Sequence, residues 1–198
     1  MRQSNTRSKP YVIGIAGGSA SGKSTFAQQL ETALESLSVE SFHMDSYFKP
    51  QEARPYAKAH VTGKMYTDDN HPETADLPKL RADLAKAIDT AASDVIIVEG
   101  LLVLHDDNIF EKLDLKLFID CRPDERIVRR LKRNMAWGLA FDEISGVYLD
   151  MVRYRHDQYV EPSKWRADLI INGSSFSSAA LALIVDGVRS QFSQHAKA

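Results

Sequence analysis

The sequence has little of what marks several large classes of protein. It contains one cysteine, Cys121, so it cannot form an internal disulfide framework, and we expect a reducing cytoplasm as its location. No run of apolar residues approaches the length of a membrane span, so we expect no membrane partner. The net charge of −2 lacks the basic excess of a nucleic-acid-binding protein, so we expect no nucleic-acid partner either.

Two further features are missing. His60 and His71 have no other ligand residues at the spacing of a zinc site. Residues 1–9 lack the apolar core of a secretory signal, and we expect a flexible tail there.

The chain has 198 residues, of which 43% are hydrophobic and 26% charged, as is ordinary for a globular protein. We therefore expect residues 10–198 to form one domain with a substantial core.

The most informative stretch fits the phosphate-binding pattern G-x-x-x-x-G-K-[ST]. An apolar, β-branched run at residues 11–16 precedes it, and an apolar stripe at helical spacing from Phe26 to Leu37 follows it. Strand, glycine loop and helix in this order form the context that the motif requires. The pattern therefore predicts a nucleoside triphosphate site made by Gly17, Gly18, Ser19, Ala20, Ser21, Gly22, Lys23, Ser24 and Thr25.

The residue types in and after this loop suit ATP and Mg²⁺ as cofactors. Small side chains let the backbone N–H groups surround phosphate at a helix N-terminus, and Lys23 can reach the outer phosphates. The Ser24 hydroxyl can complete the shell of a Mg²⁺ ion that bridges two phosphates. A second apolar run, residues 94–100, ends in Glu99 and Gly100 in the Walker B arrangement. We therefore predict that Glu99 binds Mg²⁺, directly or through water.

Asp45 follows a second short strand predicted at residues 39–44. In parallel α/β sheets the carboxyl ends of the strands are where ligands bind. A carboxylate near the terminal phosphate can accept the proton of an attacking hydroxyl or help to hold Mg²⁺, whereas a turn-forming aspartate is the alternative. Residues 46–76 show no regular pattern and contain many aromatic, carboxylate, Asn and His side chains. We expect a substrate-binding insertion there, with a solvated loop as the alternative.

Pro123 begins a predicted helix with four arginines on one face, at i, i+3 and i+4 spacing: Arg126, Arg129, Arg130 and Arg133. Arginine is suited to recognising phosphate and to stabilising a transferring phosphoryl group. An exposed cationic face is the alternative. We expect a mobile lid over the phosphates at about residues 134–147 and a helix at 142–160 with Arg153 near its middle.

The order of the elements predicts the fold class. Apolar strands alternate with helices along the chain, with a further helix predicted after Pro78, a strand at 115–120 and a last strand at 168–172. Such alternation is typical of an α/β fold with a doubly wound parallel sheet and right-handed crossovers. With the phosphate loop after the first strand, the prediction is a P-loop nucleoside triphosphate hydrolase fold with a lid.

With these residues placed, the chain resembles the uridine kinase / phosphoribulokinase family of P-loop kinases. The resemblance covers nearly all of residues 11–172 and is far more specific than the phosphate loop alone. It rests on GIAGGSASGKST at 14–25, MDSYFKP at 44–50, NHPETAD at 70–76, VIIVEGLLVL at 95–104, LFIDCRPDERIVRRLKR at 117–133 and EPSKWRADLIING at 161–173.

The resemblance implies roles for particular residues. Asp45 would activate the acceptor hydroxyl, Arg130 and Arg133 would lie near the acceptor and the phosphates, and the NHPETAD segment would touch a ribose. The predicted catalytic set is therefore Asp45, Arg130, Arg133 and Lys23. The predicted substrate-binding set is Asp45, Tyr47, Phe48, Asp69, Asn70, His71, Arg130 and Arg153.

Three departures from the family pattern bear on the acceptor. Asn70 stands where the family has a ribose-binding aspartate, with Asp68 or Asp69 as candidate substitutes. Only one helix fits between that motif and the Walker B strand, where uridine kinases carry a longer, pyrimidine-binding segment. The predicted lid has Trp137-Gly138-Leu139 in place of an arginine pair. DSYFKP and YLDMVRYR are similar to segments of nicotinamide riboside kinases, so the acceptor stays open.

We expect an ATP-dependent kinase that phosphorylates the 5′-hydroxyl of a nucleoside, uridine or cytidine, as its small-molecule acceptor. Nicotinamide riboside or another small alcohol is the alternative acceptor. A regulatory P-loop NTPase is the alternative from another class, but the sequence lacks a guanine-reading N-K-x-D stretch. A homo-oligomer is compatible with the sequence, which does not decide the oligomeric state.

Overall fold

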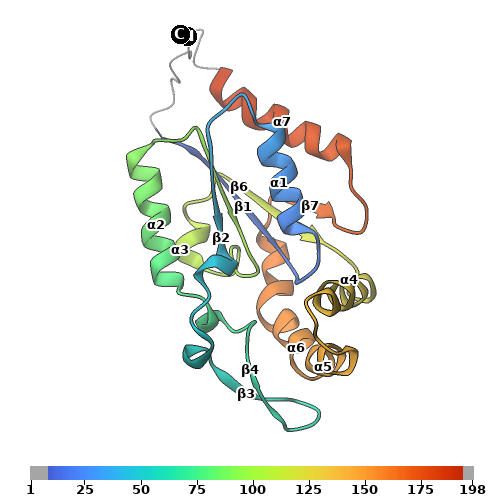
Figure 1. The fold of residues 1–198 in the computed structure, drawn as a ribbon. Coiled ribbons are helices and arrows are strands. Elements are labelled where there is room, and N and C mark those ends of the chain that lie inside the picture. The colour runs from blue at the N-terminus through green and yellow to red at the C-terminus, as the bar shows by residue number, and fades with distance from the viewer. Residues whose placement is uncertain (1–8, 194–198) are drawn as a thin grey trace.

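Five parallel strands form the central sheet of the computed structural model, which describes residues 9–193 (Figure 1). The strands are β1 (Tyr11–Gly17), β2 (Val39–His43), β5 (Val95–Glu99), β6 (Leu115–Asp120) and β7 (Leu169–Asn172). Their spatial order is β2-β5-β1-β6-β7. After β1 the chain forms the edge strand β2, returns to place β5 between β2 and β1, and then continues through β6 and β7 on the other side of β1. The predicted α/β, doubly wound parallel sheet is confirmed, whereas the tail expected at residues 1–9 lies outside the described residues except for Lys9.

Helices cover both faces of the sheet (Figure 1). On one face, α1 (Lys23–Ala33) and α7 (Ser178–Ser193) pack over Ile13, Ile15 and Ile97. On the other face, α2 (Leu77–Thr90) and α3 (Asp107–Phe110) pack over Val12 and Ile96. All five residues of β5 are buried, and the first four are apolar, as expected of a strand that helices cover on both faces of the sheet. Across residues 9–193, no helix combines the length and the apolar character needed to cross a membrane.

The start of α2 shows how the sequence sets an element boundary. Asp76 is the N-cap, and its side chain accepts a hydrogen bond of 3.0 Å from the backbone N–H of Lys79. Pro78 stands in the first turn, where a missing N–H costs no hydrogen bond. The helix ends at Thr90, and its C-cap residue Ala91 adopts the left-handed conformation at φ 48°. β5 begins four residues later, so the connection from Asp76 to the Walker B strand holds a single helix.

The expectation that residues 46–76 are irregular is wrong in one part. An antiparallel hairpin, β3 (Tyr56–Lys58) and β4 (Met65–Thr67), projects from the insertion below the main sheet in Figure 1. The short 3₁₀ helices η1 (Met44–Tyr47), η2 (Gln51–Ala53) and η3 (Pro72–Thr74) surround it. The buried Asp150 stabilises the hairpin tip, because its carboxylate accepts hydrogen bonds from the N–H groups of Val61 and Thr62.

A run of helical segments follows β6. It begins with α4 (Pro123–Ala136) and α5 (Phe141–Val147), which a turn with Gly138 at φ 91° separates. A continuous helix then alternates between π and α geometry: η4 (Tyr148–Val152), α6 (Arg153–Arg155) and η5 (His156–Val160), followed by the 3₁₀ helix η6 (Glu161–Arg166). We refer to residues 148–160 as the π-helical segment. The predicted lid, 134–147, covers the end of α4, the turn and α5, and its motion stays a prediction.

Candidate active site

The candidate site lies at the carboxyl edge of the sheet, where β1, β5 and β2 end side by side. The register pairs Ile15 of β1 with Glu99 of β5, and Glu99 with His43 of β2. Strand neighbours are about 5 Å apart, so the phosphate loop, Glu99 and the residues after His43 meet at this edge. The sheet therefore brings together the loop, the Walker B carboxylate and the segment that carries Asp45, as their positions at strand ends predict.

The phosphate loop adopts backbone conformations that favour small residues. Gly17 has φ 154° and Gly22 has φ 101°, and Ala20 is left-handed at φ 63°. A Cβ atom at Gly17 would lie 2.7 Å from the carbonyl oxygen of Ile119, so the loop passes close to β6. The N–H of Ser21 donates to the carbonyl of Gly18 at 3.0 Å, which closes a turn before α1 starts. This curled backbone at a helix N-terminus suits an anion such as phosphate.

The polar side chains of the loop contact Glu99. The Ser24 Oγ atom donates to both carboxylate oxygens of Glu99 at 3.2 Å, and the Lys23 Nζ atom lies 3.8 Å from Oε2. His43 Nδ1 lies 3.1 Å from Glu99 Oε1, one of the two oxygens that Ser24 contacts. Glu99 and Lys23 are buried, at 3% and 8% exposure, so their opposite charges stabilise each other away from bulk water.

These residues fit a magnesium ion. Hydroxyl and carboxylate oxygens are hard ligands, and Mg²⁺ takes one or two of them from a protein while its other positions go to water and phosphate oxygens. Ser24 and Glu99 supply one oxygen donor group of each kind and lie within hydrogen-bonding distance of each other. The pair could therefore hold Mg²⁺ beside the phosphates of a nucleotide.

Asp45 lies in the first turn of η1, directly after β2. Its side chain is exposed and makes no hydrogen bond or ion pair with any residue of the described chain. Gly100 fixes the position of η1, because a Cβ atom at Gly100 would collide with Met44. The close approach of these two segments holds Asp45 at the same sheet edge as Glu99, with its carboxylate available to a ligand.

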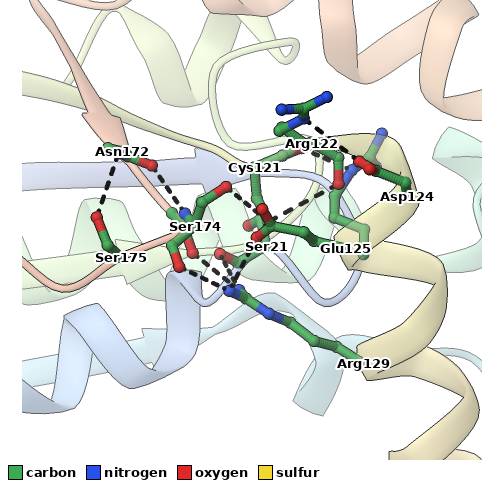
Figure 2. Close-up of polar contacts among 11 residues, drawn as sticks. Ser21, Cys121, Arg122, Asp124, Glu125, Arg129, Asn172, Ser174 and Ser175 are labelled. Atoms are coloured by element: carbon green, nitrogen blue, oxygen red, sulfur yellow. Dashed lines mark hydrogen bonds and ion pairs between the residues drawn. The ribbon is translucent and has the colours of Figure 1, made fainter.

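Two of the four arginines on α4 contact other parts of the protein. The Arg129 guanidinium donates to the carbonyl oxygens of Gly173 at 2.8 Å, Ser174 at 3.2 Å and Ser21 at 3.4 Å. Figure 2 shows this guanidinium directed between Ser21 and Ser174. Arg126 is buried and donates to the carbonyl oxygen of Cys121 at 3.1 Å. These two arginines join α4 to the phosphate loop and to the ends of β6 and β7.

The other two arginines, Arg130 and Arg133, remain available to a ligand. The Nη1 atom of Arg130 donates to the Ser19 hydroxyl at 3.0 Å, while its buried Nε has no partner among residues 9–193. Burial and the neighbouring charge of Arg133 lower the pKa of Arg130 from its ordinary value. Arg133 is exposed and stacks on the Trp137 ring at 5.0 Å. Both stay predictions as catalytic residues, and Arg130 already contacts the phosphate loop.

The aromatic residues predicted to bind the acceptor pack partly into the core. Tyr47 donates its hydroxyl to Asp83 of α2 at 3.0 Å, and burial together with Asp83 raises the pKa of Tyr47 to about 12. Phe48 forms a β-bridge with Ala75, and the Arg54 guanidinium lies 5.3 Å from its ring centre. Both rings contact the core on the α2 face of the sheet. Their contribution to acceptor binding stays a prediction.

The polar acceptor candidates are more accessible. Asp69 is half exposed and pairs with Arg54 at 3.0 Å, and Asn70 follows it in a turn. His71 caps η3 by accepting the N–H of Glu73 through Nδ1, and its ring lies edge-on to Tyr159 at 5.6 Å. Arg153 is exposed on the π-helical segment, and it lines a cavity of about 730 Å³ between the hairpin and α5. Asp69, Asn70 and His71 thus lie on the insertion, and Arg153 lies on the π-helical segment and lines the cavity without them.

Three contacts at the site were not predicted from the sequence. Asp68 is buried and pairs with Arg155 of the π-helical segment at 2.5 Å, so it is an internal anchor. His43 pairs with Glu99, and His156 contacts Arg126 at 3.2 Å. Only His43 carried a sequence signal, because it and Glu99 both lie near the carboxyl ends of predicted strands, 39–44 and 94–100. The larger cavity, about 1130 Å³ between α4 and the π-helical segment, includes His156 but no residue of the phosphate loop.

Comparisons with known proteins agree with this arrangement. The model of the Phosphoribulokinase / Uridine kinase family matches residues 12–84 and 66–178. The chain is 34% identical over 211 residues to a uridine kinase of Geobacillus kaustophilus, covering 95% of this chain and 98% of the relative. It is 33% identical to a uridine kinase of Clostridium botulinum, covering 91% of this chain and 97% of the relative.

Solved structures share the fold at lower identity. A protein from Bacillus stearothermophilus, described as a possible uridine kinase, superposes with a TM-score of 0.57 at 20% identity, covering 85% of this chain and 92% of the other. The Thermus thermophilus protein TT1252 superposes with a TM-score of 0.56 at 20% identity, covering 92% of this chain and 97% of the other.

Proposed function

The chain belongs to the phosphoribulokinase / uridine kinase family of P-loop kinases, and from this premise we propose that it transfers the γ-phosphoryl group of ATP to the 5′-hydroxyl of a nucleoside, uridine or cytidine. The observation that carries the proposal is the position of Asp45. Its carboxylate has no partner within the described residues and lies at the sheet edge that also presents Lys23, Ser24 and Glu99. A nucleotide-binding loop beside an available general base is what a kinase needs.

The donor side of the site would use the loop and its two polar contacts. Backbone N–H groups of residues 17–22 and the Lys23 ammonium would bind the phosphates, and Lys23 would leave Glu99 to do so. Ser24 and Glu99 would hold Mg²⁺. When bound, the ion would neutralise charge on the phosphates. Before the nucleotide binds, the ion pair holds the Lys23 ammonium and the Glu99 carboxylate together at the carboxyl edge of the sheet.

The transfer would use Asp45 as general base. The acceptor hydroxyl oxygen forms a bond to the γ-phosphorus, its proton passes to the Asp45 carboxylate, and the bond from the γ-phosphorus to the β,γ-bridging oxygen breaks to release ADP. Lys23, Arg130 and Arg133 would stabilise the charge that develops on the transferring group. Positioning and electrostatics would supply most of the rate enhancement, because the protein forms no covalent bond itself.

The acceptor would bind between the insertion and the π-helical segment. Asp69, Asn70 and His71 lie on the insertion, and Arg153 lies on the facing segment. Tyr47 and Phe48 would form the apolar wall next to Asp45. The identity of the acceptor would then depend on side chains that contact its base. In the connection between Asp76 and β5, only the single helix α2 could supply such side chains.

This short connection favours nicotinamide riboside as the second candidate acceptor. With only α2 between Asp76 and β5, the chain has no further segment there that could supply hydrogen bonds to a pyrimidine. A pyrimidine site would then need residues such as Tyr66 and His71. A pyridinium ring asks for fewer hydrogen bonds and could stack on an aromatic side chain.

An ATP-consumption screen with Mg²⁺ tests the proposal. The acceptors are uridine, cytidine, nicotinamide riboside, pantothenate and ribulose 5-phosphate, with an acceptor-free control. Turnover with uridine or cytidine is the expected result. Turnover with nicotinamide riboside alone would mean that nicotinamide riboside, and not uridine or cytidine, is the acceptor. Hydrolysis of ATP that no acceptor stimulates would contradict the kinase proposal and favour a regulatory NTPase.

A further inference from the structure

A buried pair of side chains lies directly against the phosphate loop at Gly18. A Cβ atom at Gly18 would collide with the Arg126 guanidinium and would lie 3.0 Å from Cε1 of His156. Arg126 is 5% exposed, and the His156 side chain is 11% exposed. Both therefore pack against the loop backbone, on the side where a larger residue at position 18 would not fit.

The hydrogen bonds of His156 determine its protonation state. Its Nδ1 atom lies 3.2 Å from Arg126 Nη1, and its Nε2 atom lies 3.2 Å from Glu161 Oε2. A guanidinium can only donate, so Nδ1 must be the acceptor. A carboxylate can only accept, so Nε2 must carry the hydrogen. The contacts on both sides are satisfied together only by the neutral tautomer with hydrogen on Nε2.

Charged groups on three other elements surround this histidine. Arg126 faces it from α4, and Glu161 and Lys164 face it from η6. Lys164 lies 2.6 Å from Glu161 and 3.4 Å from Asp120, so it connects the histidine's surroundings to Asp120 at the end of β6. Burial and the charge of Arg126 lower the pKa of His156, against the opposing effects of Glu161 and Asp157. The neutral form that the geometry requires is thus also the form that the surroundings favour.

We propose that neutral His156 is a positioning residue for nucleotide binding: through Nδ1 it holds the Arg126 guanidinium against Gly18 and so fixes the backbone of the phosphate loop. The proposal rests on the proposed function only in that the loop binds ATP. Arg126 is already anchored by its Nε hydrogen bond to Cys121, so His156 determines where the far end of the guanidinium lies.

Two variants separate the hydrogen bond from the packing. His156→Asn keeps an acceptor atom at the position of Nδ1, because Asn Oδ1 and His Nδ1 are both attached to Cγ. His156→Phe keeps a ring but removes the acceptor and leaves Arg126 Nη1 without it. His105→Asn is the matched control, because His105 is also a partly buried histidine, packs on Tyr159 of η5 at 5.4 Å, and does not contact Arg126.

The measurements are ATP affinity by titration calorimetry with Mg²⁺, KM and kcat for both substrates, and the melting temperature. We expect His156→Phe to weaken ATP binding about tenfold, as for a lost hydrogen bond to a charged group. KM for ATP should rise while KM for the acceptor stays unchanged. His156→Asn and His105→Asn should bind ATP within about threefold of wild type, less than one such bond is worth.

Three results would overturn the inference: wild-type ATP affinity in His156→Phe, equal loss in His156→Asn and His156→Phe, or a lowered melting temperature with KM for ATP unchanged. Wild-type protein that binds ATP but phosphorylates none of the acceptors would contradict the proposed function instead. In that case the calorimetric comparison still decides the role of His156, because it does not need turnover.

Discussion

At the scale of single residues, Asp45 gives the most direct test of chemistry. Asp45→Asn keeps the size of the side chain and removes its ability to accept a proton. We expect kcat to fall on the order of 10²–10⁴-fold, the usual contribution of a general base. ATP affinity should stay near normal, because the loop and not Asp45 would bind the phosphates. Steady-state kinetics and calorimetry measure the two quantities.

The matched control for Asp45 is Asp186→Asn. Asp186 is an exposed aspartate on α7, on the face of the sheet opposite to the insertion. The Asp186→Asn substitution should leave both kcat and ATP affinity unchanged. A loss of ATP binding in Asp45→Asn would mean that the carboxylate helps to hold the donor, and the role of general base would have to be withdrawn.

The buried His156 predicts a pH dependence of stability. Its pKa in the folded protein lies below the ordinary value of 6.5, because of burial and Arg126. The unfolded chain therefore takes up a proton first as the pH falls below 6.5, and stability is lost from there down to the folded pKa. The loss is bounded by about 1.4 kcal/mol per pH unit.

Urea unfolding across this range checks the sign. Wild type should lose more free energy of unfolding than His156→Asn when the pH falls from about 7.5 to about 5.5, since only wild type has an imidazole that titrates at this place. Equal pH dependence in the two proteins would show that His156 titrates alike in the folded and unfolded chains.

The sequence could predict those site residues whose signal is local. Lys23 and Ser24 follow a glycine pattern, and Glu99 ends a fully apolar strand. His156 could not be predicted, because its partner Arg126 is 30 residues away and no local pattern joins them. The sequence offers Asp68 as a candidate ribose ligand, but its burial against Arg155 depends on a contact between residues 87 positions apart. Long-range pairing of polar groups is what sequence patterns do not encode.

At the scale of elements, the contact between η1 and the end of β5 determines where Asp45 lies. Gly100→Ala would push Met44 away, because the added Cβ would collide with it. We expect a loss of about 1–3 kcal/mol of stability, as for overpacking of a core. The shift of η1 should also lower kcat more than it changes KM for ATP. Urea unfolding and kinetics measure both effects.

Gly187→Ala is the control for Gly100→Ala. Gly187 lies within α7, and a Cβ atom there would meet nothing within 4 Å. Alanine should stabilise that helix by about 0.5–1 kcal/mol, because it has the higher helix propensity. Unchanged kcat in Gly100→Ala would mean that Asp45 is not positioned through Met44.

Elements of regular length were predictable from periodicity and boundary residues, and α2 is an example, with Asp76 and Pro78 at its start. The hairpin β3–β4 was not, because its strands have only three residues each, too few to show alternation. Its tip depends on the carboxylate of Asp150, which lies 88 residues from Thr62. The π geometry within residues 148–160 likewise has no sequence signal.

At the scale of the whole molecule, a parallel sheet covered by helices follows from the alternation of strands and helices along the chain, whereas the arrangement of the insertion beside the sheet does not. The π-helical segment touches three separate parts of the protein: Asp150 binds the hairpin tip, Arg155 binds Asp68, and His156 binds Arg126 beside the phosphate loop. The segment thus joins the expected acceptor side to the nucleotide side, and its link to the insertion, the pair of Asp68 with Arg155, has a fully buried carboxylate.

Removing this link should affect the molecule as a whole. Asp68→Asn leaves the Arg155 charge, 17% exposed, without its carboxylate, which costs on the order of 3 kcal/mol for a buried pair. Asp69→Asn changes the adjacent residue, whose half-exposed pair with Arg54 contributes about 0–1 kcal/mol. Urea unfolding should separate the two variants clearly. Because the link orients the insertion, Asp68→Asn should also raise KM for the acceptor more than KM for ATP, and equal stabilities of the two variants would contradict the role assigned to Asp68.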